Sequence, residues 1–200
     1  MKTCRRQFRQ RGRQKGALIL ISLLILLVVS ILGISTIDTT GLEMQMSSNS
    51  RAQQQAFEAA EYTLSWVENN LAASGPFSKE SLRNASCGAV CFSSACTNGY
   101  CFDGTGADEY TTCKLNYSAT EPYESAALWA DGSGKYQTLA VPNTTITVRY
   151  IIEFRCYTAK DPTVDIDILN SAQLYRITAY AVGEGGRARA MLRSSVKETE

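Results

Sequence analysis

Cysteines are the residues of this chain whose chemistry can be assigned most directly. The sequence holds seven cysteines and no histidine. Cys4 lies in a basic leader, and the other six lie beyond a long apolar stretch. These six are Cys87, Cys91, Cys96, Cys101, Cys113 and Cys156. An even number of cysteines in an oxidising compartment predicts three disulfides, although their pairing stays open.

Other candidates for chemistry are weak. Without histidine or C-x-x-C pairs, neither a zinc knuckle nor a thioredoxin-like redox site is expected. The stretch 103–109 lacks the alternating carboxylates of a calcium loop, and Asp161, Asp165 and Asp167 are interpreted as parts of a solvated loop. We therefore expect no catalytic residues, no metal and no cofactor.

The first 37 residues predict a membrane anchor. Residues 1–16 form a leader with basic residues and no acid, and residues 17–37 are uncharged and long enough to span a bilayer as a helix. Positive charge stays cytoplasmic, so the remainder should face the periplasm. The apolar stretch is too long for a cleaved secretory signal. A plain uncleaved anchor stays open on this stretch alone.

The junction between Gly16 and Ala17 separates these alternatives. A glycine between a basic leader and an apolar helix resembles the prepilin peptidase site of type IV pilins. Glycine has no side chain, so a protease can approach its backbone closely. We expect cleavage after Gly16 and methylation of the new amine. Cleavage would leave 13 basic and 19 acidic residues, a net charge of −6 that gives no general attraction to nucleic acid.

Residues 38–74 predict an amphipathic continuation of the helix, with a possible break at Gly41. One apolar face recurs at helical spacing, and Gly75-Pro76 should stop the helix. The face consists of Ala52, Ala56, Ala60, Leu64, Val67 and Leu71.

Residues 138–200 predict an antiparallel sheet. Alternation over about 144–157 is typical of a half-buried strand, and two further strands run over about 175–181 and 188–197. A glycine-rich hairpin at 183–186 joins the last two. The basic residues of the third strand are typical of a charged edge strand; they are Arg187, Arg189, Arg193 and Lys197. Covering the sheet with the helix gives an α+β fold.

Two regions of the chain resemble the PilX-type minor pilins of type IV pili. They are residues 12–70, including Leu42-Glu-Met-Gln-Met46 and Ala56-Phe-Glu-Ala-Ala-Glu61, and residues 173–196. The resemblance implies a long helix packed on an antiparallel sheet and a low-abundance subunit that initiates or caps pili. Its partners would be other minor pilins, the major pilin, prepilin peptidase and the inner-membrane assembly platform.

Ile21 departs from the pattern of most pilins, which carry a glutamate at the fifth mature residue. In the family this glutamate pairs with the amine of the preceding subunit. Its absence predicts a subunit at or near the pilus tip. The resemblance implies that such a minor pilin supports adhesion and twitching motility. One alternative is that helix packing alone is enough for assembly, so that Ile21 carries no information about position in the filament. Two further alternatives concern the class of protein: a pseudopilin of a type II secretion system, or a plain membrane-anchored periplasmic protein.

Residues 75–137 form a predicted insertion that holds five of the cysteines and has little periodicity. A loop-rich segment of this length needs covalent staples. It is either a surface loop held by disulfides or a contact surface for another minor pilin or a tip adhesin.

Overall fold

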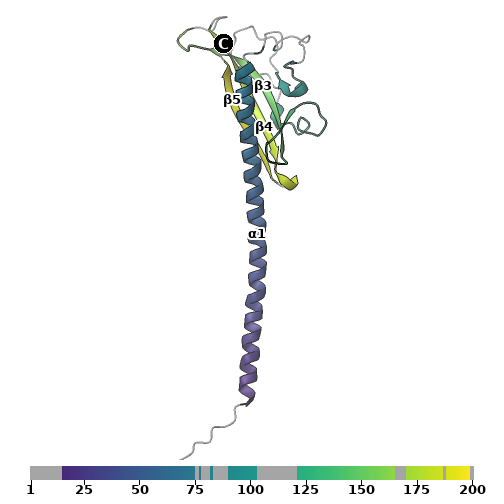
Figure 1. The fold of residues 1–200 in the computed structure, drawn as a ribbon, viewed down its shortest axis with the longest axis vertical. Coiled ribbons are helices and arrows are strands. Elements are labelled where there is room, and N and C mark those ends of the chain that lie inside the picture. Colours follow the sequence, from purple (N-terminus) through teal and green to yellow (C-terminus); the bar gives the residue numbers. More distant parts are fainter. Residues whose placement is uncertain are drawn as a thin grey trace, which may run out of the picture. The chain divides into compact units, whose positions relative to one another are not determined.

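The computed structural model describes residues 15–74, 77, 82, 90–102, 121–164, 170–186 and 188–198. The chain separates into two compact units, residues 1–48 and 49–200. Figure 1 labels the principal helix and strands.

One helix, α1, runs over Lys15–Ser74 and continues through Gly41 without a break. It confirms the helix predicted from the apolar and amphipathic stretches. Leucine in its first half and alanine, glutamine and glutamate in its second half favour this helix, and it ends directly before Gly75-Pro76, where proline would remove a backbone donor.

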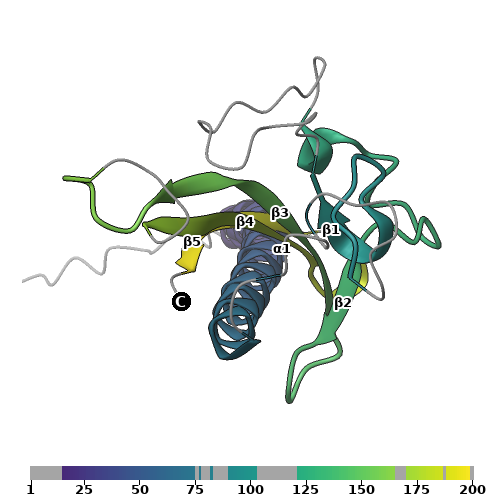
Figure 2. The same ribbon diagram turned by 90° about the horizontal axis from the view of Figure 1, so that it is seen from above.

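The second unit contains a five-stranded sheet (Figure 2). Its strands are β1 (Tyr100–Cys101), β2 (Gln137–Ala140), β3 (Thr147–Ala159), β4 (Ser171–Val182) and β5 (Arg189–Glu198). The order is β1-β3-β4-β5, and β2 also pairs with β3. Antiparallel pairing joins β3 to β4 and β4 to β5, so the predicted core of the sheet is confirmed.

The edges of the sheet differ from the sequence-based expectation. The strand expected at 144–157 is β3, and it begins and ends later than expected. Neither β1 nor β2 was predicted, because strands of two and four residues show no periodicity. The two residues of β1 pair parallel to β3, which makes the sheet mostly rather than wholly antiparallel.

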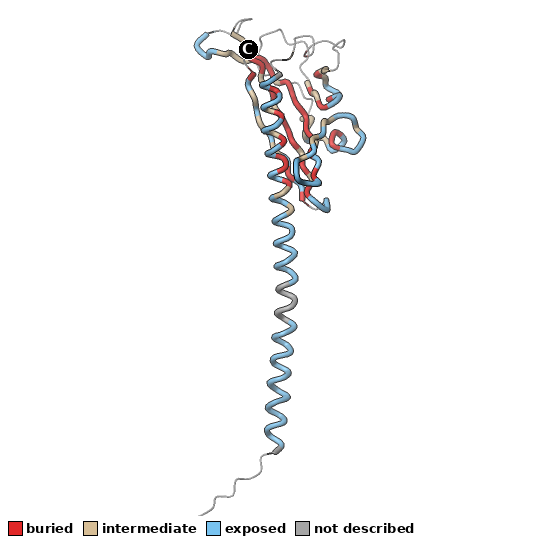
Figure 3. The backbone as a smooth tube through the Cα atoms, viewed as in Figure 1, coloured by how far each residue is buried: buried red, intermediate tan, exposed pale blue. Residues whose placement is uncertain are grey.

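The inner face of the sheet is covered by the part of α1 that belongs to the second unit. Ala56, Ala60, Val67 and Leu71 are buried, and Ala52 and Leu64 pack against the same core, so the predicted helical face is confirmed (Figure 3). Small side chains allow the helix and sheet to approach closely. A Cβ placed on Gly183 would lie 2.8 Å from the Ala52 carbonyl oxygen.

The middle of the outer face of β3 is buried as well, which corrects the prediction of a half-buried strand there. Ile151 packs there with Leu128, Trp129, Cys96 and Cys101 in a second apolar cluster. Residues 121–136 supply much of this covering layer. They showed no alternation in the sequence, so the layer could not be inferred from periodicity.

Candidate functional site

The predicted processing and assembly residues lie at the start of α1, in the first unit. Gly16, Ala17 and Ile21 are exposed, and apart from its chain neighbours and its own helix backbone, no described part of the protein lies within 4 Å of a Cβ built on Gly16. The Ile21 side chain is 59% exposed. These positions are therefore accessible in the folded chain to another protein or to lipid.

The span Gly16–Ile34 is long and apolar enough to cross a membrane, and none of it is buried within the protein. Its two serines satisfy their hydroxyls inside the helix: Ser22 donates to the Ile19 carbonyl at 2.9 Å and Ser30 to the Leu26 carbonyl at 2.8 Å. The helix thus offers its surroundings an almost wholly apolar surface. Burying one exposed leucine or isoleucine contributes about 1.5–3 kcal/mol, so this surface favours lipid or other helices.

The second half of α1 carries two buried residues that the predicted face did not include. Ala59 and Thr63 widen the contact with the sheet, and the Thr63 hydroxyl donates to the Ala59 carbonyl at 2.9 Å. A buried threonine is acceptable there because its only polar side-chain group is bonded within the helix. The sequence signal for Thr63 is its spacing of seven residues from Ala56, about two helical turns, which places both on one face of the helix.

The Cys96–Cys101 disulfide lies in the apolar cluster on the outer side of the sheet. Cys96 and Cys101 are joined to each other around η1 (Thr97–Gly99), and Cys91 and Cys156 are also disulfide-bonded. Cys87 and Cys113 lie outside the described residues. Three disulfides therefore remain a prediction, and the mass of the unreduced mature protein, six hydrogens below the reduced mass, would test it.

A buried ion-pair cluster between the covering layer and the sheet was missed from the sequence. Glu153 is fully buried and accepts two hydrogen bonds from Arg176, at 2.7 and 2.8 Å. Arg176 also pairs with Glu121 at 2.6 Å, and the Tyr123 ring lies 5.2 Å from its guanidinium. The feature that could have revealed this pair is the register of β3 and β4, because Glu153 and Arg176 are direct cross-strand partners.

The electrostatics of Arg176 favour the charged form. Burial by itself lowers the pKa of this guanidinium, but the hydrogen bonds and charges of Glu153 and Glu121 outweigh burial and raise the pKa. The cluster therefore holds a permanent positive charge against two carboxylates. Such a group stabilises one arrangement of the layer and carries no sign of proton-transfer chemistry.

The basic face of the last strand lies on β5, which is at the edge of the sheet as predicted. Two of its charges are engaged within the protein. The Arg193 guanidinium lies 4.0 Å from the Tyr123 ring centroid, and Lys197 donates to the Ala159 carbonyl at 2.7 Å. Arg187 lies outside the described residues. These contacts weaken the case for a site that binds an acidic partner.

The residues considered for calcium do not converge in the described part of the chain, where no group of three potential metal ligands occurs. Asp161 instead accepts hydrogen bonds from the Thr163 backbone and hydroxyl, at 2.9 and 2.7 Å. These bonds lower the pKa of the Asp161 carboxyl. The stretch 103–109 and residues Asp165 and Asp167 lie outside the described residues.

Comparison with protein families gives two matches. A model described as PilX N-terminal matches residues 15–64, and one described as type IV pilus assembly protein PilX C-term matches residues 97–198. No curated protein and no solved structure matches the chain. The two matched regions include most of α1, up to residue 64, and every strand of the sheet.

Proposed function

Because the chain belongs to the type IV pilus assembly protein PilX family, a family of pilus proteins rather than enzymes, we propose that it is a minor pilin at or near the pilus tip. It initiates or caps the filament and thereby supports adhesion and twitching motility. The observation that carries this proposal is the start of α1, whose apolar side chains are exposed and where Ile21 occupies the position at which most pilins have a glutamate.

Processing at the membrane is the first step of the proposed function. Prepilin peptidase cuts between Gly16 and Ala17, and the new amine is methylated. The exposure of both residues and the open space around Gly16 support access by a protease. Before assembly the chain crosses the inner membrane once, with its second unit in the periplasm.

The position in the filament follows from charge. A carboxylate in the apolar span would cost on the order of 2.5–3.5 kcal/mol at mid-membrane unless it found a partner. In pilins that carry it, the amine of an earlier subunit is that partner. With Ile21 this chain attracts no earlier amine, but its own Ala17 amine remains available to the glutamate of the next subunit. A first subunit needs only the second of these interactions.

The partners of the proposed function are the other minor pilins and the major pilin, through the apolar part of α1. Prepilin peptidase and the inner-membrane assembly platform act on the chain earlier. The matched families describe pilus assembly, so the alternative of a type II secretion pseudopilin receives no separate support.

Gold labelling of sheared pili with antibody to residues 75–137 tests the tip position. We expect label at one end of each filament. The variant Ile21→Glu should spread label along the shafts, because it restores attraction to an earlier subunit, whereas Ile25→Glu, one turn further along, should not. Label distributed evenly along wild-type pili would rule out the tip position and leave the family assignment intact.

A further inference from the structure

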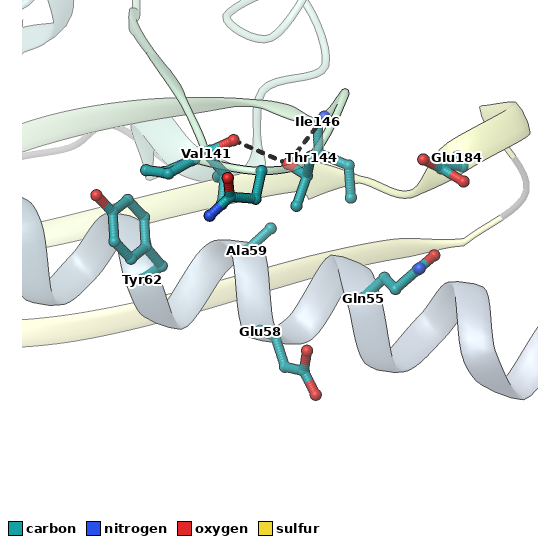
Figure 4. A pocket seen from close by; sticks show the side chains of 10 residues that line it. Gln55, Glu58, Ala59, Tyr62, Val141, Thr144, Ile146 and Glu184 are labelled. Carbon is teal, nitrogen blue, oxygen red and sulfur yellow. Dashed lines mark hydrogen bonds between the residues drawn. The ribbon is translucent and has the colours of Figure 1, made fainter.

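A groove in the second unit lies beside α1 and has no assigned occupant. It has a volume of about 370 Å³ and is bounded by α1, by the connection between β2 and β3, and by Glu184. Figure 4 shows Tyr62 and Glu184 toward opposite ends, with Val141 and Thr144 beside the helix. The groove is far too small for a folded domain and suits a short segment.

The walls of the groove combine apolar surface with unused polar groups. Ala59 and Ile146 are buried and form apolar lining. The side-chain amides of Gln55 and Asn143 and the hydroxyl of Tyr62 make no hydrogen bond to any part of the chain that the structure describes. Each amide can both donate and accept, as pairing with a peptide backbone requires.

The charges at the groove have one sign. Glu58 and Glu184 are its charged lining residues, and none of the described lining residues is basic. One oxygen of Glu58 accepts from Gln54 at 3.0 Å, and one oxygen of Glu184 accepts from Thr145 at 3.0 Å. A carboxylate has two oxygens, so each of these groups can still receive a donor from outside.

The length of the groove sets the size of its occupant. Gln55 and Tyr62 are seven residues apart on α1, about 10.5 Å along a helix. An extended chain advances about 3.3 Å per residue, so this distance accommodates roughly three residues.

We propose that this groove receives an extended segment of about three residues, containing lysine or arginine, from a neighbouring pilus subunit. The inference rests on the proposed function, which supplies the neighbour. The amides of Gln55 and Asn143 pair with the backbone of the segment, and Glu184, at one end of the groove, pairs with its basic side chain, while Glu58 adds negative charge beside α1 (Figure 4). Complementary charge of this kind fixes which partner docks and in which register.

Photo-crosslinking in intact cells tests the inference on the full chain. A photoreactive residue replaces Thr144 at the groove or, as a control, Ser65 on the exposed part of α1. We expect the photoreactive residue at position 144 to cross-link to a peptide that contains lysine or arginine and belongs to another pilus subunit. The double variant Glu58→Lys, Glu184→Lys should reduce the cross-link by about tenfold or more. The charge-matched variant Glu61→Lys, Glu124→Lys should leave it unchanged.

Three results would overturn the inference: a cross-link that survives the groove reversal, no cross-link above that of the Ser65 control, or a product attached to a glycan. The presence of the chain in sheared pili is measured in the same cells. If the wild-type chain is absent from pili, the proposed function fails; if it is present without a groove-dependent cross-link, only the groove inference fails.

Discussion

The two units of this protein differ in whether their apolar surface is exposed or buried and in whether they contain charge there. In the first unit, the span Gly16–Ile34 exposes its apolar side chains and contains no charge between Ala17 and its end. In the second unit, α1 buries one stripe against the sheet, and the buried Glu153 is bonded to Arg176. The second unit buries its apolar stripe and pairs its buried Glu153 internally, whereas the first needs surroundings that the chain alone does not supply.

This difference predicts which property of the protein a substitution in each unit should alter. Substitutions in the first unit should alter processing and assembly while leaving the sheet folded. Substitutions at buried positions of the second unit should alter the free energy of unfolding. Exceptions to this division would show that the units depend on each other.

The largest effect is expected at the leader junction. Gly16→Leu should block removal of the leader almost completely, because a bulky side chain prevents close approach of the protease to the backbone. The full-length chain should then accumulate in the membrane and be missing from pili, as measured by immunoblot and intact mass. Gly33→Leu is the matched control, and it should be processed normally. Normal processing of the Gly16→Leu variant would rule out Gly16 as the residue that the peptidase requires at the cleavage site.

The next effect concerns the buried charge of the second unit. Arg176→Met should destabilise the detergent-solubilised full chain by about 3–5 kcal/mol, because it leaves Glu153 buried without its bidentate partner. Denaturant unfolding measures this change. The double variant with Glu153→Leu should recover part of the loss, and the exposed control Arg189→Met should have little effect. An equally stable Arg176→Met protein would mean that Glu153 is not enclosed as described.

A smaller loss is expected where α1 meets the sheet. Ala60→Leu should cost about 1–3 kcal/mol, because Ala60 is fully buried and extra methyl groups overfill the contact. The neighbouring Glu61→Leu changes an exposed position and serves as its control in the same unfolding measurement. Equal effects of the two changes would contradict the placement of this helical face.

The smallest effect is a pH dependence at alkaline pH. Burial, followed by the nearby Tyr100, raises the pKa of Tyr150 from 10.0 to about 12, and its hydroxyl donates to Gln137 at 2.6 Å. Between pH 10 and 12 the folded state keeps this proton while the unfolded state loses it, so stability should fall as pH rises. Unfolding curves across this range should show a shallower decline for Tyr150→Phe. Identical slopes would exclude a contribution from Tyr150.

Much of the inner core could be predicted because it depends on local periodicity. The spacing of Ala56, Ala60, Val67 and Leu71 places them on one helical face, and alternation in β3 and β4 places Tyr150 and Ile177 on one face of a sheet. The PilX resemblance, which the family matches confirm, added the packing of helix on sheet, which the structure shows in the second unit. Leader cleavage, methylation and the roles of Gly16, Ala17 and Ile21 remain predictions.

The sequence by itself determined the apolar span, the long helix and the inner faces of the main strands, because each is a repeating pattern within one segment. Only the tertiary structure decided that the outer face of β3 is covered, that β1 joins the sheet in parallel, and that Glu153 is buried against Arg176. These features depend on residues 90–102 and 121–136, which reach the sheet from distant parts of the chain and carry no period of their own. Burial at Ile151 and Glu153 is a property of that contact, so periodicity within β3 could not predict it.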